Sequence, residues 1–239
     1  MSGEFESLAV LVAARNEADV ISEAIGALKE TFPGAAIWVA DDASDDGTND
    51  LALAAGAKVV RRGRSHGKGG NVTACAEAML SDPDLPATVL LCDADLARSA
   101  GQLGRLVTAI EQDECDLAVA SFARRVGGGF GIALGFSAWV IRKRCGATPT
   151  APISGQRAMR LDVLRAVLPF APDYGMETGM TIDAVRAGYR LREYELELAH
   201  KATGRNLKGF IHRGWQLADF ARVWWSRRGG RGPGGRRPA

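Results

Sequence analysis

The sequence lacks the features that mark membrane-spanning, secreted and zinc-binding proteins. No apolar run reaches the roughly 18 residues that a membrane-spanning helix needs. The opening segment, residues 1–6, is acidic, whereas a secretory signal begins with basic residues. The four cysteines stand far apart in the 239-residue chain and form no Cys-x-x-Cys pair, so they indicate neither a zinc site nor a disulfide framework. We therefore expect a cytoplasmic protein with its cysteines in the core.

Charge is nearly balanced over the chain but unevenly placed. The formal net charge is +2, and residues 226–239 carry five arginines and no acidic residue, which leaves −3 for the rest of the chain. This segment is rich in arginine and glycine and has no apolar residue to anchor it in a core, so we expect a disordered tail. Such a tail can contact RNA or anionic lipid, or it can have no dedicated partner. We do not expect nucleic acid as the main partner.

The hydrophobic pattern predicts alternating strands and helices. Residues 8–13 form a continuous apolar run typical of a strand buried on both faces, and apolar residues at helical spacing follow from Val20 to Phe32. A second strand is expected at 36–40, and strand, helix and strand within about 35 residues form the parallel crossover unit. Further strands are expected at 57–60, 89–95, 116–122, 153–160 and 189–196, and further helices at 51–55, 72–80, 100–112 and 210–225. We predict one α/β domain, residues 1–225, with a mostly parallel central sheet flanked by helices.

The fourth predicted strand ends in two carboxylates. Asp93 and Asp95 lie one residue apart, and in a strand that spacing projects both side chains from one face. Mg²⁺ and Mn²⁺ take such hard oxygen ligands, and beside a diphosphate they use one or two protein carboxylates. An isolated Asp-x-Asp is also common at solvated strand ends, so the neighbouring motifs decide between the two interpretations.

Three further polar segments follow predicted strands. Residues 14–17 and 41–48 come directly after the first and second strands, and in a parallel sheet ligands collect beyond the carboxyl ends of the strands. Asn16 is expected to cap the helix that follows it. Residues 66–71 form a glycine-rich turn whose backbone N–H groups, with Lys68, suit a phosphate. The spacing is not that of a P-loop, and a flexible surface turn has the same composition.

In this order the four segments resemble the N-terminal half of family 2 glycosyltransferases with the GT-A fold. The matching motifs are Val-Ala-Ala-Arg-Asn-Glu, Asp-Asp-Ala-Ser-Asp-Asp-Gly-Thr, Gly-Lys-Gly-Gly-Asn and Asp-Ala-Asp, within residues 8–96. The resemblance implies a nucleotide-sugar-binding half at 8–96, an acceptor half at 97–225, and a divalent cation, Mg²⁺ or Mn²⁺, that neutralises charge on the leaving group. The implied contacts are, for the nucleoside, Ala13, Arg15 and Glu17; for the base, Asp41 or Asp42; for the diphosphate or base, Lys68; and for the ribose and metal, Asp93, Ala94 and Asp95.

Two segments of the acceptor half extend the resemblance. Residues 153–160 are similar to the Ser-Gly-x-Arg strand of processive and dolichol-phosphate-type members, which implies that Gln156 and Arg157 face the acceptor. Residues 170–183 contain Tyr-Gly-x-Glu-x-Gly, and Glu177 matches the acid that deprotonates the acceptor hydroxyl in family 2 enzymes. The same stretch resembles glucosyl-3-phosphoglycerate synthases, which retain configuration, so Glu177 is either a base or a group that orients the sugar or acceptor. A glutamate favoured by the helix dipole is the structural alternative.

A histidine and an arginine after the last predicted strand match further positions of those synthases. The resemblance implies that His200 completes the metal shell and that Arg205 contacts the acceptor phosphate, although the spacing between them is longer here. Imidazole suits a Mn²⁺ site, whereas a lone histidine is more often structural.

Apolar segments of the acceptor half raise the question of membrane contact. The run from Phe130 to Ile141 is too short to cross a bilayer and suits either a core helix or a surface that touches a lipid acceptor. Trp224 and Trp225 end the last amphipathic helix and either close the core or seat that helix on a membrane. Peripheral membrane contact through this helix and the basic tail, and a homodimer, are both left open.

Together the motifs predict a metal-dependent glycosyltransferase. From the resemblance alone we expect a UDP-sugar donor, with glucose first among the sugars, and a phosphorylated acceptor such as phosphoglycerate or a polyprenyl phosphate. Two alternatives stay open. A nucleotidyltransferase uses a related sheet, but the glycine- and arginine-containing loop expected after its first strand is replaced here by residues 13–17. A non-catalytic nucleotide-binding or RNA-binding protein would depend on the basic tail.

Overall fold

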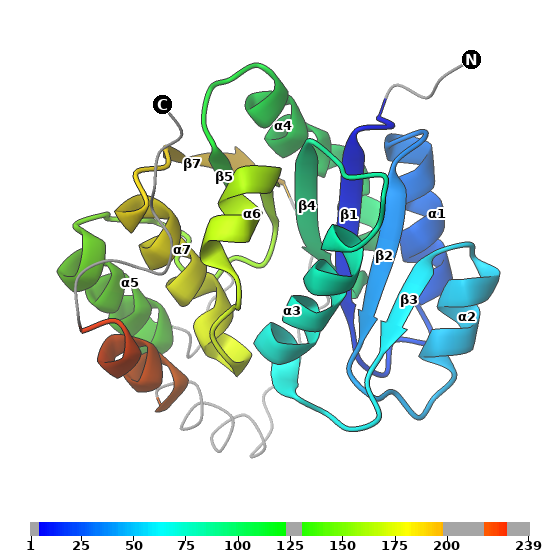
Figure 1. Ribbon diagram of the computed structural model, residues 1–239, viewed down its shortest axis with the longest axis horizontal. Helices are drawn as coiled ribbons and strands as arrows, with labels where there is room; N and C mark the ends of the chain where they lie inside the picture. The colour runs from blue at the N-terminus through cyan, green and yellow to red at the C-terminus, as the bar shows by residue number, and fades with distance from the viewer. Residues whose placement is uncertain (1–4, 123–130, 198–217, 229–239) are drawn as a thin grey trace.

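The computed structural model describes residues 5–122, 131–197 and 218–228, and the structural statements below concern this part of the chain. It forms a seven-stranded sheet with helices on both faces (Figure 1). The strands are β1 (Leu8–Ala14), β2 (Ala36–Asp41), β3 (Lys58–Arg61), β4 (Thr88–Asp93), β5 (Leu117–Phe122), β6 (Arg157–Arg160) and β7 (Leu191–Leu196). The helices are α1 (Ile21–Thr31), α2 (Thr48–Ala54), α3 (Gly67–Leu80), α4 (Ala100–Glu111), α5 (Gly131–Cys145), α6 (Leu161–Val167) and α7 (Met176–Arg186), with 3₁₀ turns η1 (Ala94–Ser99) and η2 (Asp173–Gly175). A final helix occupies residues 218–226.

The sheet is mostly parallel, as predicted. Its strand order is β3-β2-β1-β4-β6-β5-β7, and β6 runs antiparallel to both of its neighbours. The carboxyl ends of β1, β2 and β4 therefore meet at one edge, and the start of β6 lies at the same edge because its direction is reversed. We call this the carboxyl edge of the sheet and the opposite one the amino edge. The predicted α/β class is confirmed.

Both faces of the sheet are covered, which explains the uninterrupted apolar run of the first strand. In β1, Val10 and Val12 pack into a cluster with α1, α2 and α4, whereas Ala9 and Leu11 pack into a second cluster with α3, α6 and α7. Successive strand residues point to opposite faces, so a strand with two covered faces needs apolar residues at every position. The helices on either side of the sheet are visible in Figure 1.

A third, smaller cluster joins α5, α7 and the helix at 218–226. Its buried residues include Val140 and Ile141 of α5, Ile182 of α7 and Val223. The apolar run after residue 130 is therefore a core helix, one of the two roles left open from the sequence. The last helix also corrects a boundary, because Ser226 is helical and Arg227 pairs with Asp183, although both were assigned to a disordered tail.

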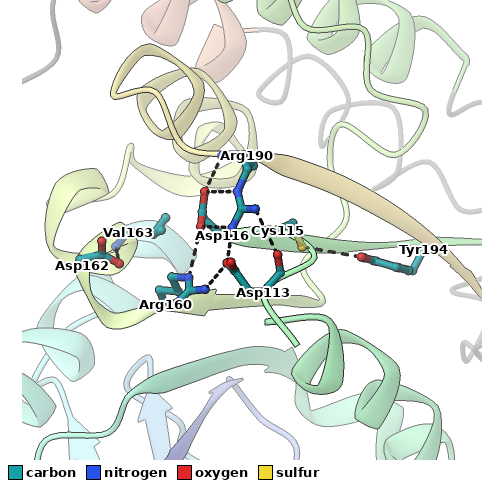
Figure 2. A network of polar contacts seen from close by, with 8 residues as sticks. All are labelled: Asp113, Cys115, Asp116, Arg160, Asp162, Val163, Arg190 and Tyr194. Carbon is teal, nitrogen blue, oxygen red and sulfur yellow. Dashed lines mark hydrogen bonds and ion pairs between the residues drawn. The ribbon is translucent and has the colours of Figure 1, made fainter. Parts of the chain in front are cut away.

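Charged residues tie together three strand ends at the amino edge (Figure 2). Arg190, before β7, donates to Asp116 before β5 and to Asp113 in the preceding turn. Arg160, at the end of β6, also donates to both aspartates. Two cations thus face two carboxylates. The network fixes the ends of β5, β6 and β7 relative to one another.

Two local expectations are wrong. Asn16 does not cap α1, because the helix begins at Ile21 and the capping position is Val20. Asn16 instead has a positive φ of 55° and its backbone N–H donates to Ser44 Oγ at 2.9 Å. The glycine-rich segment is not a turn ahead of a helix beginning at residue 72, since α3 begins at Gly67 and includes Lys68 in its first turn.

The state of the cysteines and the presence of membrane-spanning helices can both be examined in the described residues. All four cysteines are free, and Cys75, Cys92 and Cys115 are buried while Cys145 is half-buried, which confirms the prediction of core thiols. Within the described ranges, no helix combines the length and the apolar character needed to cross a membrane.

Candidate functional site

Four polar side chains meet at the carboxyl edge, each from a different segment. Lys68 comes from the first turn of α3, Asp93 from the end of β4, Gln156 from the residue before β6 and Glu177 from the first turn of α7. Nζ of Lys68 lies 2.7 Å from Oδ1 of Asp93 and 2.9 Å from Oε1 of Glu177. Nε2 of Gln156 donates to Oδ2 of Asp93 at 3.2 Å. We call these four residues the Lys68 cluster.

Burial and neighbouring charge act in opposite directions on Lys68. Desolvation lowers its pKa, but the carboxylates of Asp93 and Glu177 outweigh that effect and raise the pKa well above its usual value. Lys68 therefore carries its charge throughout the neutral range. One ammonium faces two carboxylates in the cluster, and the buried guanidinium of Arg157 also acts on Glu177.

Buried polar atoms around this cluster lack hydrogen-bond partners in the described part of the chain. They are Oδ1 of Asn71, Oγ of Ser154 and Oε1 of Gln156. An unsatisfied buried polar atom costs about 1–3 kcal/mol, so folded proteins keep few of them. All three belong to segments that the sequence predicts to bind substrate. They mark positions where a ligand or water can add hydrogen bonds.

Two glycines allow the surrounding segments to approach closely. A Cβ at Gly155 would lie 2.6 Å from Oδ2 of Asp93 and 2.7 Å from Nζ of Lys68, closer than side-chain carbons stand in proteins. A Cβ at Gly69 would lie 1.9 Å from the carbonyl oxygen of Ala171. Gly155 is not among the residues predicted from the sequence. Its position between Ser154 and Gln156 in the Ser-Gly-x-Arg pattern was the available signal.

Asp42 organises the loops that follow β2 and β3. Its Oδ2 accepts a hydrogen bond from Oγ of Ser65 at 2.6 Å, and its Oδ1 accepts one from the backbone N–H of His66 at 2.8 Å. Arg15 reaches the same place, with Nη1 3.7 Å from Asp42 and 2.8 Å from Oγ of Ser65. Arg15 itself is exposed. The structure therefore brings together two of the predicted donor-binding residues.

Asp41 is fully buried and holds its own loop. Its Oδ1 accepts hydrogen bonds from the backbone N–H and the hydroxyl of Ser44, and Nε of Arg61 lies 3.5 Å from Oδ2. The following segment is tied to the one after β1, since the backbone N–H of Glu17 donates to Oγ1 of Thr48 at 2.8 Å. The carboxylate of Asp41 is thus engaged in loop structure.

Ala13 lies between the two groups of polar residues. It pairs with Ala40 of β2 on one side and with Asp93 of β4 on the other. The residues predicted to bind the donor are therefore adjacent along the carboxyl edge.

Asp93 and Asp95 do not project from one face of a strand, which corrects the prediction. β4 ends at Asp93, and the next residue, Ala94, is buried and begins the 3₁₀ turn η1. Asp95 therefore belongs to the turn. The period-of-two argument applies only while the chain stays extended, and here the chain leaves the sheet between the two carboxylates. Both residues remain at the carboxyl end of β4.

Arg157 does not face an acceptor, contrary to the prediction. Its side chain is 1% exposed and donates to the carbonyls of Ser154 and Pro152 and to Oγ1 of Thr181 in α7. Burial lowers the pKa of Arg157 to about 10, so it stays charged at neutral pH. Consecutive residues in extended chain point in opposite directions, so Gln156 and Arg157 cannot both turn to Asp93. Gln156 does so.

Two predicted residues, His200 and Arg205, lie outside the described residues. In the ranges that are described, no three or more His, Cys, Asp and Glu side chains are grouped so as to hold a metal ion by themselves. A site at Asp93 and Asp95 would need further oxygen or nitrogen donors.

Comparisons with known proteins agree with one another on the class. Residues 9–165 match the family described as "Glycosyl transferase family 2". An undecaprenyl-phosphate mannosyltransferase of Micrococcus luteus is 31% identical over 208 residues, covering 80% of this chain and 83% of that protein. Glucosyl-3-phosphoglycerate synthase from Mycobacterium tuberculosis is similar in structure. Its complex with Mg²⁺ and UDP has a TM-score of 0.73 at 25% identity, covering 92% of this chain and 78% of the synthase. Its complex with Mn²⁺, UDP-glucose and phosphoglyceric acid has a TM-score of 0.72 at 25% identity, covering 92% and 79%.

Proposed function

This chain belongs to glycosyl transferase family 2, and we propose that it moves a sugar, glucose in first place, from a UDP-sugar to a phosphorylated acceptor, using Mg²⁺ or Mn²⁺. The family and enzyme class expected from the motifs are confirmed. Membership also favours sugar transfer over the nucleotidyltransferase alternative.

The Lys68 cluster is the observation that carries the proposal. It lies at the carboxyl edge of a mostly parallel sheet, where such folds bind nucleotides. The first turn of α3 supplies backbone N–H groups and Lys68, while β4 supplies Asp93. Lys68 can move from the carboxylates to a diphosphate oxygen, since both are charge-assisted hydrogen-bond acceptors. The cluster combines an ammonium group, two carboxylates and an amide oxygen without a hydrogen-bond partner, and this combination suits a charged, polar ligand.

The two carboxylates at the end of β4 are suitable ligands for a divalent cation. Asp93 has a side-chain exposure of 31%, and Asp95 follows in η1. Their carboxylate oxygens are hard ligands of the kind that Mg²⁺ and Mn²⁺ take. Lys68 offsets one of the two carboxylate charges at the end of β4, which leaves this position attractive to a cation. Such an ion, when bound, stabilises the charge that develops on the nucleoside-diphosphate leaving group. His200 stays a proposed further ligand.

The relatives support different halves of the proposal. The synthase from M. tuberculosis, in complex with Mn²⁺ and UDP-glucose, supports UDP as the nucleotide and glucose as the sugar. The M. luteus mannosyltransferase supports a lipid-linked phosphate as the acceptor class and mannose as a competing sugar. Both classes of acceptor carry a phosphate. A phosphorylated acceptor is therefore the common part of the two.

The two acceptor classes make different demands on Glu177. A hydroxyl that attacks with inversion must lose its proton to a base, whereas a phosphate monoester is already ionised at neutral pH because its second pKa is about 6. Glu177 is buried and its Oε1 lies 2.9 Å from Nζ of Lys68. That ion pair fixes the orientation of the carboxylate in the free protein. We propose that Glu177 orients the reactants in either case and accepts a proton only from a hydroxyl acceptor.

Thermal stabilisation tests donor and metal together. Melting temperatures are measured with UDP, GDP and their sugars, each with Mn²⁺, Mg²⁺ or EDTA, for the wild type and Asp95→Ala. A ligand at a hundred times its dissociation constant adds about 2.7 kcal/mol, which gives a clear shift. We expect UDP to stabilise the wild type only with metal, and Asp95→Ala to lose that shift. Equal stabilisation of the variant would remove Asp95 from the site, and no stabilisation by any nucleotide would overturn the proposal.

UDP release with defined acceptors then separates the acceptor classes. The enzyme is incubated with UDP-glucose and either phosphoglycerate or an undecaprenyl phosphate dispersed in detergent. Faster release of UDP with one of the two acceptors identifies the acceptor class. Release that neither acceptor accelerates would contradict a phosphorylated acceptor, although the donor part of the proposal would stand.

A further inference from the structure

The two neighbouring tryptophans of the last helix have different environments. Trp224 stacks on Trp139 of α5, with ring centroids 4.7 Å apart, and so helps to close the third core cluster. Trp225 is 60% exposed, and the guanidinium of Arg228 lies 3.2 Å from its ring centre. One tryptophan therefore serves the core and the other stands at the surface with a cation on its ring.

Positive charge gathers beside this exposed indole. The guanidinium of Arg144, near the end of α5, lies 3.4 Å from the ring centre of Trp224. Burial and the nearby cations Arg186 and Arg228 all lower the pKa of Arg144, so Arg144 and Arg228 share one positive environment. The preceding residues of α5, Arg142 and Lys143, are exposed.

Some basic residues of this region form ion pairs with acidic residues, and others do not. Arg222 pairs with Asp219, and Arg227 pairs with Asp183, so their charges are compensated. In the described part of the chain, Arg142, Lys143 and Arg228 form no ion pair. The sequence beyond residue 228 adds three arginines and no acid. The surface around Trp225 therefore has charge left for an external anionic partner.

The helix that bears Trp225 is held next to the candidate site. A Cβ at Gly175 would lie 2.7 Å from Cγ2 of Val223, so the helix packs directly on the start of α7, two residues before Glu177. The ion pair of Arg227 with Asp183 of α7 fixes its position. In Figure 1 this helix, drawn in orange-red, lies beside α5 at the end of the molecule toward which the arrows of β2 and β3 point.

We propose that Trp225, Arg228, Arg142 and Lys143 form a surface that docks on an anionic lipid bilayer. Tryptophan prefers the membrane–water interface, where its ring is buried and its N–H stays hydrated, and basic residues beside it are drawn to anionic headgroups. Single-stranded RNA, whose bases stack on aromatic faces, is the competing occupant, and measurements of vesicle binding and RNA binding distinguish the two. The docked orientation brings the carboxyl edge of the sheet toward the membrane surface.

Sedimentation with lipid vesicles tests this surface on the full chain. Vesicles of phosphatidylcholine alone are compared with vesicles that also contain phosphatidylglycerol. We expect binding to the anionic vesicles only, weakened by salt. Trp225→Ala and Arg228→Glu should each lower the partition coefficient for anionic vesicles roughly tenfold, as expected for the loss of an interfacial anchor. Tryptophan fluorescence should shift to the blue on binding in the wild type and not in Trp225→Ala.

Matched controls come from other elements of the domain. Leu53 on α2 is 51% exposed, and Arg165 on α6 is exposed, so Leu53→Ala and Arg165→Glu remove comparable groups elsewhere. We expect both to bind vesicles as the wild type does. Equal binding to neutral vesicles, or full binding by Trp225→Ala and Arg228→Glu, would overturn the proposal. So would a single-stranded RNA oligonucleotide that binds in a Trp225-dependent manner while vesicles do not bind.

A measurement of nucleotide binding on the same variants separates the test of the docking surface from the test of the proposed function. Stabilisation by UDP and Mn²⁺ is measured on the same variants, and Trp225→Ala and Arg228→Glu should retain it. Vesicle binding without nucleotide stabilisation would overturn only the proposed function, whereas nucleotide stabilisation without vesicle binding would overturn only the docking surface.

Discussion

The two edges of the sheet both carry charged networks, but they are built differently. At the amino edge two arginines face Asp113 and Asp116, and Arg190 is half exposed to solvent (Figure 2). At the carboxyl edge one ammonium, that of Lys68, serves two carboxylates, and the side chain of Glu177 is only 6% exposed. Among the described residues, buried polar atoms without a hydrogen-bond partner occur in Gln156 of the second network and in neighbouring segments, and none occurs in the four residues of the first.

This difference separates a structural role from a functional one. A network with matched charges at a surface joins strand ends, and its loss costs little because water replaces it. A partly buried network that lies among unsatisfied polar atoms is held together at a cost to stability. Such arrangements concentrate where a protein binds a charged ligand or performs chemistry.

The largest effect is expected for Glu177→Gln. The amide keeps the shape of the side chain but removes the charge that pairs with Lys68 and the capacity to accept a proton. With a hydroxyl acceptor we expect kcat to fall about 10²- to 10⁴-fold, the usual range for loss of a positioned base. With a polyprenyl phosphate the fall should be smaller, because no proton must be removed. Steady-state rates with both acceptors make the comparison.

Asp113→Asn at the amino edge is the matched control. It also removes one carboxylate that pairs with an arginine. Its kcat should equal that of the wild type. An unchanged kcat for Glu177→Gln with both acceptors would remove Glu177 from the catalytic site.

The second effect concerns the support behind the site. Arg157→Ala leaves the buried carbonyls of Ser154 and Pro152 without their donor. We expect a loss of about 3 kcal/mol in the free energy of unfolding, since each unsatisfied buried group costs about 1–3 kcal/mol. Urea denaturation measures it. Arg157→Lys keeps a charge but not the fork of donors, and should recover only part of the loss. Full stability of Arg157→Ala would mean that the hydrogen bonds contribute nothing net.

A third, smaller effect is expected for Gly155→Ala. The new methyl would overlap the ends of Asp93 and Lys68, which can move, so the fold survives while the cluster shifts. We expect at least a tenfold loss of activity, since misplacement by about 1 Å costs up to a hundredfold in rate. Gly101→Ala in α4 is the control, because a Cβ there meets nothing within 4 Å. Equal activity of the two variants would show that the cluster tolerates displacement.

The residues that could be read from the sequence are those whose role follows from local pattern. The apolar runs of β1, β2 and β4 predicted buried parallel strands, and the polar residues after them, such as Arg15, Asp42 and Lys68, indicated the carboxyl edge. These inferences succeed because strand order in a crossover unit follows from chain order. The meeting of Lys68 with Glu177, 109 positions later, depends on how α7 packs and has no local signal.

The errors have the same origin. The prediction for Asp95 is wrong because the residue pattern does not state where the chain leaves the sheet, which here is after Asp93, two residues earlier than expected. Arg157 was placed toward the acceptor because a motif gives residue types and not the direction of side chains. The antiparallel pairing of β6 with β4 and the contact of Gln156 with Asp93 both come from tertiary packing.

The smallest effect is expected at the amino edge, for Asp116→Asn. Hydrogen bonds from Arg190 lower the pKa of Asp116 below its unfolded value of about 3.9. A carboxyl group with a lowered folded-state pKa stabilises the protein above the unfolded pKa and loses that contribution as the pH falls through the folded pKa. The variant should therefore be less stable than the wild type by no more than about 1 kcal/mol at neutral pH, and the difference should shrink below about pH 4. Urea denaturation across this pH range measures it. A constant difference would assign the loss to packing instead of charge, and a change in kcat at neutral pH would break the contrast between the two edges.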